Sequence, residues 1–486
     1  MKPFNWKFVW YIIGILLIIE SAFLFISTLV SAIYMEHDFI PFIISTLFTL
    51  CCGGLLIWSC YDHDKDLHRR EGFFIVSFSW IALSFFGMLP FILSKSIPSV
   101  TDAFFETMSG FTTTGASILN DIDSLPHGVL FWRSIIQWLG GMGVIVFTLA
   151  LLPRLGVAGG VQLFNSEAPG LTHDKLSPRI DQTAKRLWGM YLVITIACAG
   201  FLCAGPMSFF DSICHAFTTM ATGGFSTKQA SIAYWGSAYI EYIITAFMFI
   251  AGTNFTLVYF FLKGKPKKMF KDEEFRFYIT VITVCTLVIT IGLLTSGIMS
   301  GVESTFRTSL FQVVSLLTTT GFATADFIPW GTFYWVLMLM IMLPGGSAGS
   351  TSGGMKLVRV LVLTKNTVNE FKRQVHPNAI LPVRINKVVV PFELVTKVLA
   401  FMFIYLMIIL VSSLILAGLG TGFEESVGSV ITCISNVGPG LGETGPSGNF
   451  ANLHPFAKWF LSFIMLVGRL ELFTVLTILT PSFWRE

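Results

Sequence analysis

Long apolar stretches alternate with short polar segments along the whole chain. Each stretch is long enough to cross a hydrocarbon core about 30 Å thick, because a helix rises about 1.5 Å per residue. The pattern predicts membrane spans at residues 8–34, 39–61, 72–94, 129–152, 187–206, 236–262, 277–299, 333–365, 394–419 and 456–479. The first run is much longer than the apolar part of a signal peptide, so it is expected to be a retained anchor helix.

Four shorter helix-like stretches interrupt this pattern, and each ends in a glycine flanked by small or hydroxylated residues. The glycine segments are Thr112 to Ala116, Met220 to Gly224, Thr318 to Phe322 and Ser435 to Pro439. At about ten residues, each preceding stretch is too short to cross the bilayer and must enter and leave on one face. Taken alone, one Thr-Thr-Thr-Gly is best interpreted as an ordinary helix end, since glycine is common there. Four copies in register favour a pore.

The glycine segments recur roughly every 100 residues, so the chain reads as a fourfold repeat. The expected fold is an all-α polytopic membrane protein, with four pseudo-symmetric span, pore-helix, span repeats around a central ion pore. Two extra transmembrane helices (1–70) precede the repeats, which cover 71–155, 156–270, 271–375 and 376–486. Asp102 and Asp211 mark the starts of the first two pore helices, Ser304 or Thr305 the third, and Glu424 or Glu425 the fourth.

The glycine segments suit a selectivity filter. A potassium ion must exchange its water shell for other oxygens, and inward-facing backbone carbonyls supply these without fixed charge. Glycine permits the positive φ that such a turn needs, and helix C-terminal ends direct partial negative charge at the axis. The predicted filter residues are Thr113, Thr114, Gly115, Thr222, Gly223, Thr319, Thr320, Gly321, Asn436, Val437 and Gly438.

Composition and charge support a membrane protein and exclude several other classes. Hydrophobic residues make up 54% of the chain and charged residues 12%, and the net charge of +3 is too small to indicate nucleic-acid binding. Basic segments at 65–70, 154–186, 263–276 and 356–397 alternate with the spans and mark the cytoplasmic side, so both termini are expected there. Arg133 is among the few cations assigned to the outer side.

Catalytic and cofactor motifs give no competing signal. The eight cysteines lie mostly in apolar runs and form no CxxC pair, so free buried thiols are expected. The Gly440, Gly442, Gly445 pattern lacks a preceding strand, and the 349–356 segment lacks an adjacent Gly-Lys pair, so neither is interpreted as a nucleotide site. We therefore expect no enzyme activity and no organic cofactor, with potassium as the transported ion.

The third inner span contains a glycine- and serine-rich break. Residues 333–343 give half a span, and 344–354 cannot compete as a helix with other conformations. We predict an intramembrane gating loop at 344–356, with Gly345, Gly346, Ser347, Gly349, Ser350, Gly353 and Gly354 as gate residues. The alternative is a flexible cytoplasmic linker, which would leave 333–343 too short to span.

Arg469 interrupts the last apolar run, where an arginine costs at least ~2.5 kcal/mol without partners or water. One interpretation pairs it with Glu471, although residues two apart lie on different helix faces. The preferred one places it below the filter, donating to the 345–354 loop and repelling cations. Small residues at 140–143, 252–254, 345–347 and 468 recur after each filter segment, at a level where inner helices can approach closely or bend.

The chain resembles the TrkH-type subunits of the Trk/Ktr/HKT potassium transporter superfamily over nearly its whole length. The most specific segments are Gln137 to Gly143, Pro344 to Lys356 and Gly468 to Glu471. The resemblance implies one filter glycine per repeat, at Gly115, Gly223, Gly321 and Gly438. It also implies a homodimer with one pore per subunit, and a cytosolic nucleotide-binding ring partner of the TrkA type. The fourth repeat departs from the pattern, with Asn436-Val437 before its glycine and Pro439 after it.

The expected function is potassium uptake across the cytoplasmic membrane through a channel-like pore. The alternative is a sodium-coupled secondary transporter of an organic solute, which is also built from broken helices. Such transporters usually carry inverted repeats around one midplane site, whereas four parallel repeats favour a central ion path. The sequence leaves open whether uptake is passive or a symport coupled to protons or sodium.

Overall fold

The computed structural model describes residues 4–62, 69–141, 143 and 180–485. In these ranges the regular structure is almost entirely helical, which confirms the predicted all-α fold. The described strands are the short antiparallel pair β1 (Arg384–Ile385) and β2 (Val388–Val389). The predicted repeat boundaries stay predictions, and the one near residue 155 lies outside the described residues.

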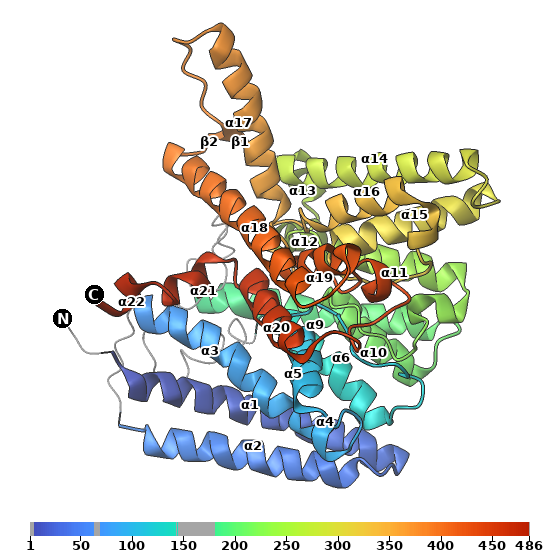
Figure 1. The fold of residues 1–486 in the computed structure, drawn as a ribbon, viewed down its shortest axis with the longest axis vertical. Helices are drawn as coiled ribbons and strands as arrows, with labels where there is room; N and C mark the ends of the chain where they lie inside the picture. Colours follow the sequence, from blue (N-terminus) through green and yellow to red (C-terminus); the bar gives the residue numbers. More distant parts are fainter. Residues whose placement is uncertain (1–3, 63–68, 142, 144–179, 486) are drawn as a thin grey trace.

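Six described helices are long and apolar enough to cross a membrane. They are α1 (Trp6–Tyr34), α2 (Phe39–Ser59), α3 (Arg69–Gly87) continuing into α4 (Leu89–Leu93), α9 (Ile180–Cys203), α14 (Glu273–Thr295) and α18 (Phe392–Gly418). In Figure 1, α1 and α2 lie side by side along one edge of the molecule. Gly14 and Gly53 allow this close approach, because a Cβ on either would lie 2.9 Å from the backbone oxygen of the other.

The four short stretches before the glycine segments are helices, as predicted. They are α5 (Val100–Phe111), α10 (Phe209–Met220), α15 (Val302–Leu317) and α19 (Phe423–Ser435). Ser99 and Ser208 cap the first two, accepting from the amides of Asp102 and Asp211 in the first turn.

The predicted starts of the third and fourth pore helices are wrong. Gly301 and Gly422 precede α15 and α19, and no side chain caps either helix. Ser304, Thr305, Glu424 and Glu425 therefore lie inside these helices.

Each inner helix ends near the recurring small residues. These helices are α6 (His127–Gly141), α11 (Ala238–Ala251), α16 (Thr332–Met342) and α20 (Pro455–Arg469). The second continues as α12 (Phe255–Leu262) after a bend of 108°, and the third as α17 (Leu357–Val375) after a long loop. The fourth breaks before α21 (Phe473–Ile478), so the predicted single span at 456–479 is wrong. The end of the predicted span at 129–152 lies outside the described residues.

The repeats close into a ring. The first helix of each repeat (α3, α9, α14, α18) packs on its own pore helix. Each inner helix also packs on the pore helix of the next repeat: α6 on α10, α11 on α15, α16 on α19, and α20 on α5. The last contact joins the end of the chain to its first repeat, which gives the fourfold arrangement a closed centre.

The remaining short elements lie in the segments between these helices and at the C-terminal end of the described residues. They are the 3-10 helices η2 (Ser231–Trp235), η3 (Ile328–Trp330) and η4 (Gly442–Thr444), with the short helices α13 (Pro266–Lys271) and α22 (Pro481–Arg485). Figure 1 shows α17 and the β1–β2 hairpin extending away from the body, on the side opposite α1 and α2.

Candidate ion-permeation site

The four glycine segments share one backbone conformation. The first residue of each turn is left-handed although it is not glycine, with φ of 54° at Thr113, 51° at Thr222, 56° at Thr319 and 55° at Asn436. Two residues later comes a glycine of positive φ, at 78° for Gly115, 79° for Gly224, 81° for Gly321 and 109° for Gly438. Threonine rarely adopts this region, so the surrounding structure must hold the turns in place.

This pattern corrects the predicted filter of the second repeat. Gly223 was expected to be its filter glycine, but the glycine of positive φ is Gly224. Gly223 instead takes the place held by Thr114, Thr320 and Val437 in the other repeats. Because both residues are glycine, the sequence offered no local signal to choose between them.

Backbone hydrogen bonds fix each turn to its own pore helix. The amide before each positive-φ glycine donates back to a carbonyl five residues earlier: Thr114 to Ser109 at 2.8 Å, Gly223 to Thr218 at 2.9 Å, Thr320 to Ser315 at 2.8 Å and Val437 to Thr432 at 3.0 Å. This bond is typical of a helix that ends in a left-handed residue. The four turns therefore leave their helices in the same direction.

The turns approach one another in cyclic order. A Cβ on Gly115 would lie closest to the Gly223 carbonyl oxygen, one on Gly224 to that of Thr320, one on Gly321 to that of Val437, and one on Gly438 to that of Thr114. Each separation would be below 3.0 Å, which real Cβ atoms essentially never show. The ring has no room for a side chain at these four positions.

All four positive-φ glycines line one hollow of about 90 Å³, together with Arg133 and Lys228. Gly223 does not line it. Among the described residues, no group of three His, Cys, Asp or Glu side chains is placed to hold a metal ion. The ring itself presents backbone carbonyl and hydroxyl oxygens, which are the type of ligand that a desolvated monovalent cation takes.

The predicted gating loop lies directly against the second and third turns. Gly353 donates from its amide to Thr319 Oγ1 at 2.7 Å, and Thr351 Oγ1 donates to the Met220 carbonyl at 3.0 Å. The loop glycines Gly345, Gly349 and Gly354 all have positive φ, so it follows a path that other residues would resist. A flexible cytoplasmic linker is not what the structure shows.

The remaining predicted gate residues brace the loop. Ser350 Oγ donates to the Ser347 carbonyl at 2.6 Å, and the Ser347 amide donates to the Gly252 carbonyl at 2.9 Å. A Cβ on Gly346 would lie 2.9 Å from the same Gly252 oxygen. The loop of the third repeat is thus anchored at the bend between α11 and α12.

Arg469 connects this loop to the first repeat. Its Nη1 donates to the Thr351 carbonyl at 2.9 Å, and its Nη2 donates to the carbonyls of Gly140 at 2.7 Å and Gly141 at 3.1 Å. Glu471 pairs with Arg359 instead, so the alternative interpretation of an Arg469–Glu471 pair is wrong. The guanidinium lies where helix breaks of three repeats meet.

Comparison with known proteins places the chain in a family. The profile of TrkH, a cation transport protein family, matches residues 40–485. The chain belongs to the TrkH family. It is 42% identical over 482 residues to the Trk system potassium uptake protein TrkH of Escherichia coli K12, covering 98% of both chains, and 34% identical over 489 residues to TrkG of the same organism, covering 100% of both. It also matches the crystal structure of the potassium transporter TrkH from Vibrio parahaemolyticus with a TM-score of 0.89, 39% identity and 99% coverage of both chains.

A second set of residues in this TrkH-family chain was missed by the sequence reasoning. Nine residues before each positive-φ glycine lies a buried polar side chain that holds the segment beyond the turn. Glu106 accepts from the Ile118 amide at 2.9 Å, His215 bonds Ser226 at 2.9 Å, Gln312 donates to the Ala325 carbonyl at 2.7 Å, and Ser429 donates to Thr444 Oγ1 at 3.2 Å. In the sequence, these four residues share only their distance of nine residues from the positive-φ glycine. Counting from Gly223 instead of Gly224 in the second repeat hid that common distance.

Arg133, which the sequence assigned to the outer side, is a buried residue. It is 1% exposed and pairs with Glu106 at 2.9 Å, and its Nη1 donates to the Ser226 carbonyl at 3.1 Å. It also lies 4.3 Å from the ring centre of Phe225. The pair therefore braces the segments beyond the first and second turns together.

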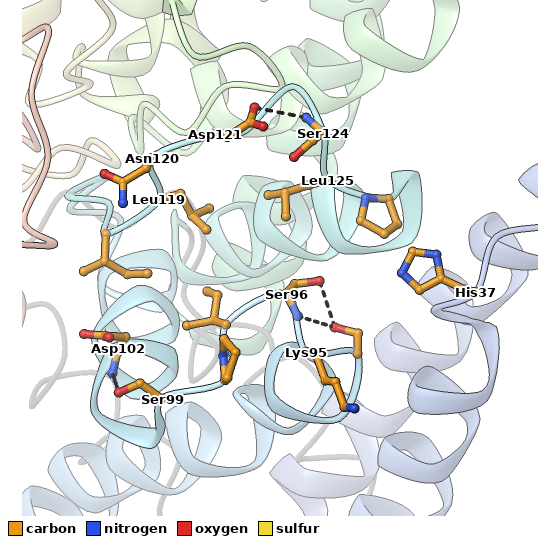
Figure 2. A pocket seen from close by; sticks show the side chains of 15 residues that line it. His37, Lys95, Ser96, Ser99, Asp102, Leu119, Asn120, Asp121, Ser124 and Leu125 are labelled. Carbon is orange, nitrogen blue, oxygen red and sulfur yellow. Dashed lines mark hydrogen bonds between the residues drawn. The ribbon is translucent and has the colours of Figure 1, made fainter.

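A larger hollow of about 450 Å³ lies beside the first repeat rather than on the ring. Figure 2 shows its walls, which include Lys95, Ser99 and Asp102 on one side and Asp121 and Ser124 on the other. None of the four positive-φ glycines lines it. Asp102, in the first turn of α5, is also paired with Lys458 of α20. The residues of this recess therefore help to hold the first pore helix in place.

Proposed function

We propose that this chain is the pore-forming subunit of a potassium uptake system. The observation that carries the proposal is the closed ring of four equivalent turns, whose positive-φ glycines line a single hollow. The choice of potassium as the ion comes from its relatives, which are named as potassium uptake proteins of the Trk system. No specific observation favours a sodium-coupled transporter of an organic solute, because the hollow at the ring has a volume of only about 90 Å³.

The ring provides both coordination and charge. Each pore helix directs its C-terminal end, with partial negative charge, at the turn that follows it. Carbonyl oxygens around the ring replace the hydration shell of a cation without fixed carboxylates, so the ion binds and still leaves. The turns bind potassium at Thr113, Thr114, Gly115, Thr222, Gly223, Gly224, Thr319, Thr320, Gly321, Asn436, Val437 and Gly438.

The gate proposed here is the loop at 344–356 with Arg469. The loop lies against the second and third turns, and the arginine adds a positive charge beside it. In this position the two block a cation by occupying its path and by repelling it. Opening then requires the hydrogen bonds of Arg469 to the loop and to α6 to break.

We also propose an assembly and a location for the chain by analogy with this family. The subunit forms a homodimer in which each chain has its own pore, in the cytoplasmic membrane with both termini on the cytoplasmic side. A separate cytosolic ring protein of the TrkA type binds nucleotide and regulates the flux. Support comes from the relatives being parts of a Trk system, and from the basic segments that face one side.

Reversal potentials test the proposal. The purified chain is reconstituted into planar bilayers, and potassium, sodium and proton gradients are applied one at a time. The reversal potential is expected to follow the potassium gradient. A reversal potential insensitive to potassium would overturn the proposal, and a response to the sodium or proton gradient would identify the coupling ion. Adding ATP or NADH to the chain alone should leave the current unchanged.

A further inference from the structure

Gln137 of α6 is fully buried and makes two hydrogen bonds to the second filter turn. Its Nε2 donates to the Gly223 carbonyl oxygen at 2.6 Å, and its Oε1 accepts from the Phe225 amide at 3.0 Å. One partner is a carbonyl and the other an N–H, so the chemistry of the site fixes which end of the carboxamide faces which. A side chain with both a donor and an acceptor is required here.

The second turn lacks the brace found in the first and third. In those turns the hydroxyl of Thr114 is bonded to that of Thr112 at 2.8 Å, and Thr320 to Thr318 at 2.8 Å. The equivalent residues of the second turn are Ala221 and Gly223, which carry no hydroxyl.

Gln137 occupies the space that such a side chain would need. A Cβ on Gly223 would lie between 2.4 and 2.8 Å from three atoms of the Gln137 carboxamide. Gln137 and Gly223 are therefore a matched pair, in which the glutamine supplies both the volume and the hydrogen bonds missing from the turn.

The other inner helices carry methionine at the same register. Gln137 lies four residues before Gly141, and Met248, Met342 and Met465 lie four residues before Gly252, Gly346 and Arg469. All three methionines are buried. Methionine has no N–H and only a weak sulfur acceptor, so it cannot make the two bonds that Gln137 makes.

We infer that Gln137 is a specificity-positioning residue, whose carboxamide holds the Gly223 carbonyl in the filter ring. The inference rests on the proposed function. Gly223 O is the atom that a Cβ on Gly115 would meet first, so its position also sets the spacing between the first and second turns. Without the carboxamide, the second turn loses its side-chain brace and the ring loses its fixed size. Discrimination between cations of different radius then falls, while permeation continues.

The test compares three variants of the full chain in bilayers, with the potassium-to-sodium permeability ratio as the readout. Gln137→Met copies the other repeats, and Gln137→Glu keeps the shape but gives a carboxylate that cannot donate to the Gly223 carbonyl. Ser134→Ala is the matched control, because Ser134 lies on the same buried helix and its hydroxyl donates to the Leu130 carbonyl at 3.0 Å rather than to a filter turn. Rubidium uptake verifies that each variant conducts.

The ratio is expected to fall severalfold in both Gln137 variants and to stay at the wild-type value in Ser134→Ala. Wild-type ratios in both Gln137 variants would overturn the inference, even if their thermal stability dropped, because the side chain would then be structural. If Gln137→Met does not fold, the shape-conserving Gln137→Glu decides alone. A wild-type chain that does not discriminate potassium from sodium would instead contradict the proposed function.

Discussion

Arg469 and Thr351 are joined by a hydrogen bond of 2.9 Å from guanidinium to backbone carbonyl, across 118 residues of sequence. The bond connects the end of α20 to the middle of the loop at 344–356. The same guanidinium donates to the last residues of α6. The non-helical loop has carbonyl oxygens that need hydrogen-bond donors, and the buried guanidinium has N–H groups that need acceptors. The bonds between them meet both needs.

Replacing Arg469 by alanine is expected to raise flux and leave ion preference largely unchanged. A hydrogen bond to a charged group contributes ~1.5–3 kcal/mol, so losing even one closed-state bond shifts the gate about tenfold or more towards open. Rubidium uptake into proteoliposomes at matched protein density measures the effect. Arg373→Ala is the control, because it removes the same charge from the partly exposed side chain that pairs with Glu370. Unchanged or reduced uptake in Arg469→Ala would mean that the arginine is structural and that the gate lies elsewhere.

Gly224→Ala is expected to abolish selective flux. Its φ is +79°, and a Cβ there would collide with the Thr320 carbonyl. Gly236→Ala is the control, since Gly236 also has positive φ, at +52°, but nothing lies within 4 Å of its added Cβ. That control isolates the cost of a left-handed alanine, about 1–2 kcal/mol. Cation-competition uptake in cells deficient in potassium transport compares the two. If both variants showed the same uptake and ion preference, the expected clash at Gly224 would be contradicted.

Much of this fold is visible in the sequence because apolar runs and glycine turns report local requirements. The 344–356 loop was predictable from glycine and serine content alone. The break after Arg469 was not, because Leu470 and the residues beyond Leu472 continue the apolar run. Glu471 and Leu472 both adopt positive φ, and neither is a glycine that would mark such a turn in the sequence.

Long-range pairing explains the other failures. Glu106 and Arg133 lie on different helices, 27 residues apart, so the sequence did not reveal that the arginine is buried and paired. In the second repeat Gly223 and Gly224 are consecutive, so the sequence did not show which of them has the positive φ. Glycine caps replaced the acidic and hydroxylated residues expected at the starts of α15 and α19.

Breaking the buried Glu106–Arg133 pair is expected to cost more folding stability than breaking the exposed Glu303–Arg307 pair. Both side chains are essentially unexposed, so Glu106→Ala leaves a buried arginine unpaired, a loss of roughly 3–5 kcal/mol. Glu303→Ala is the control, because Glu303 is 61% exposed and exposed pairs contribute about 1 kcal/mol or less. Thermal unfolding in detergent should show a much larger fall in midpoint for Glu106→Ala. Similar midpoints in the two variants would contradict this assignment.

Arg359 and Glu471 are expected to act as one unit in restraining the gate. Arg359 lies in the first turn of α17, directly after the loop, and Glu471 lies in the strained turn after α20. Arg359 also donates to the Met355 carbonyl at 2.8 Å, so the ion pair holds the C-terminal end of the loop against the fourth repeat. Breaking the pair frees α17 to move with the loop, and flux should rise in Arg359→Ala and in Glu471→Ala.

The double variant distinguishes a shared restraint from two separate effects. If the two residues act through each other, rubidium uptake by the Arg359→Ala, Glu471→Ala chain should match that of the single variants, because the second change has nothing left to break. Glu393→Gln is the control, since Glu393 is an exposed acid in the first turn of α18 and its substitution removes one surface charge without breaking the Arg359–Glu471 pair. Single-variant effects that simply add in the double variant would show that the pair does not restrain the loop as a unit.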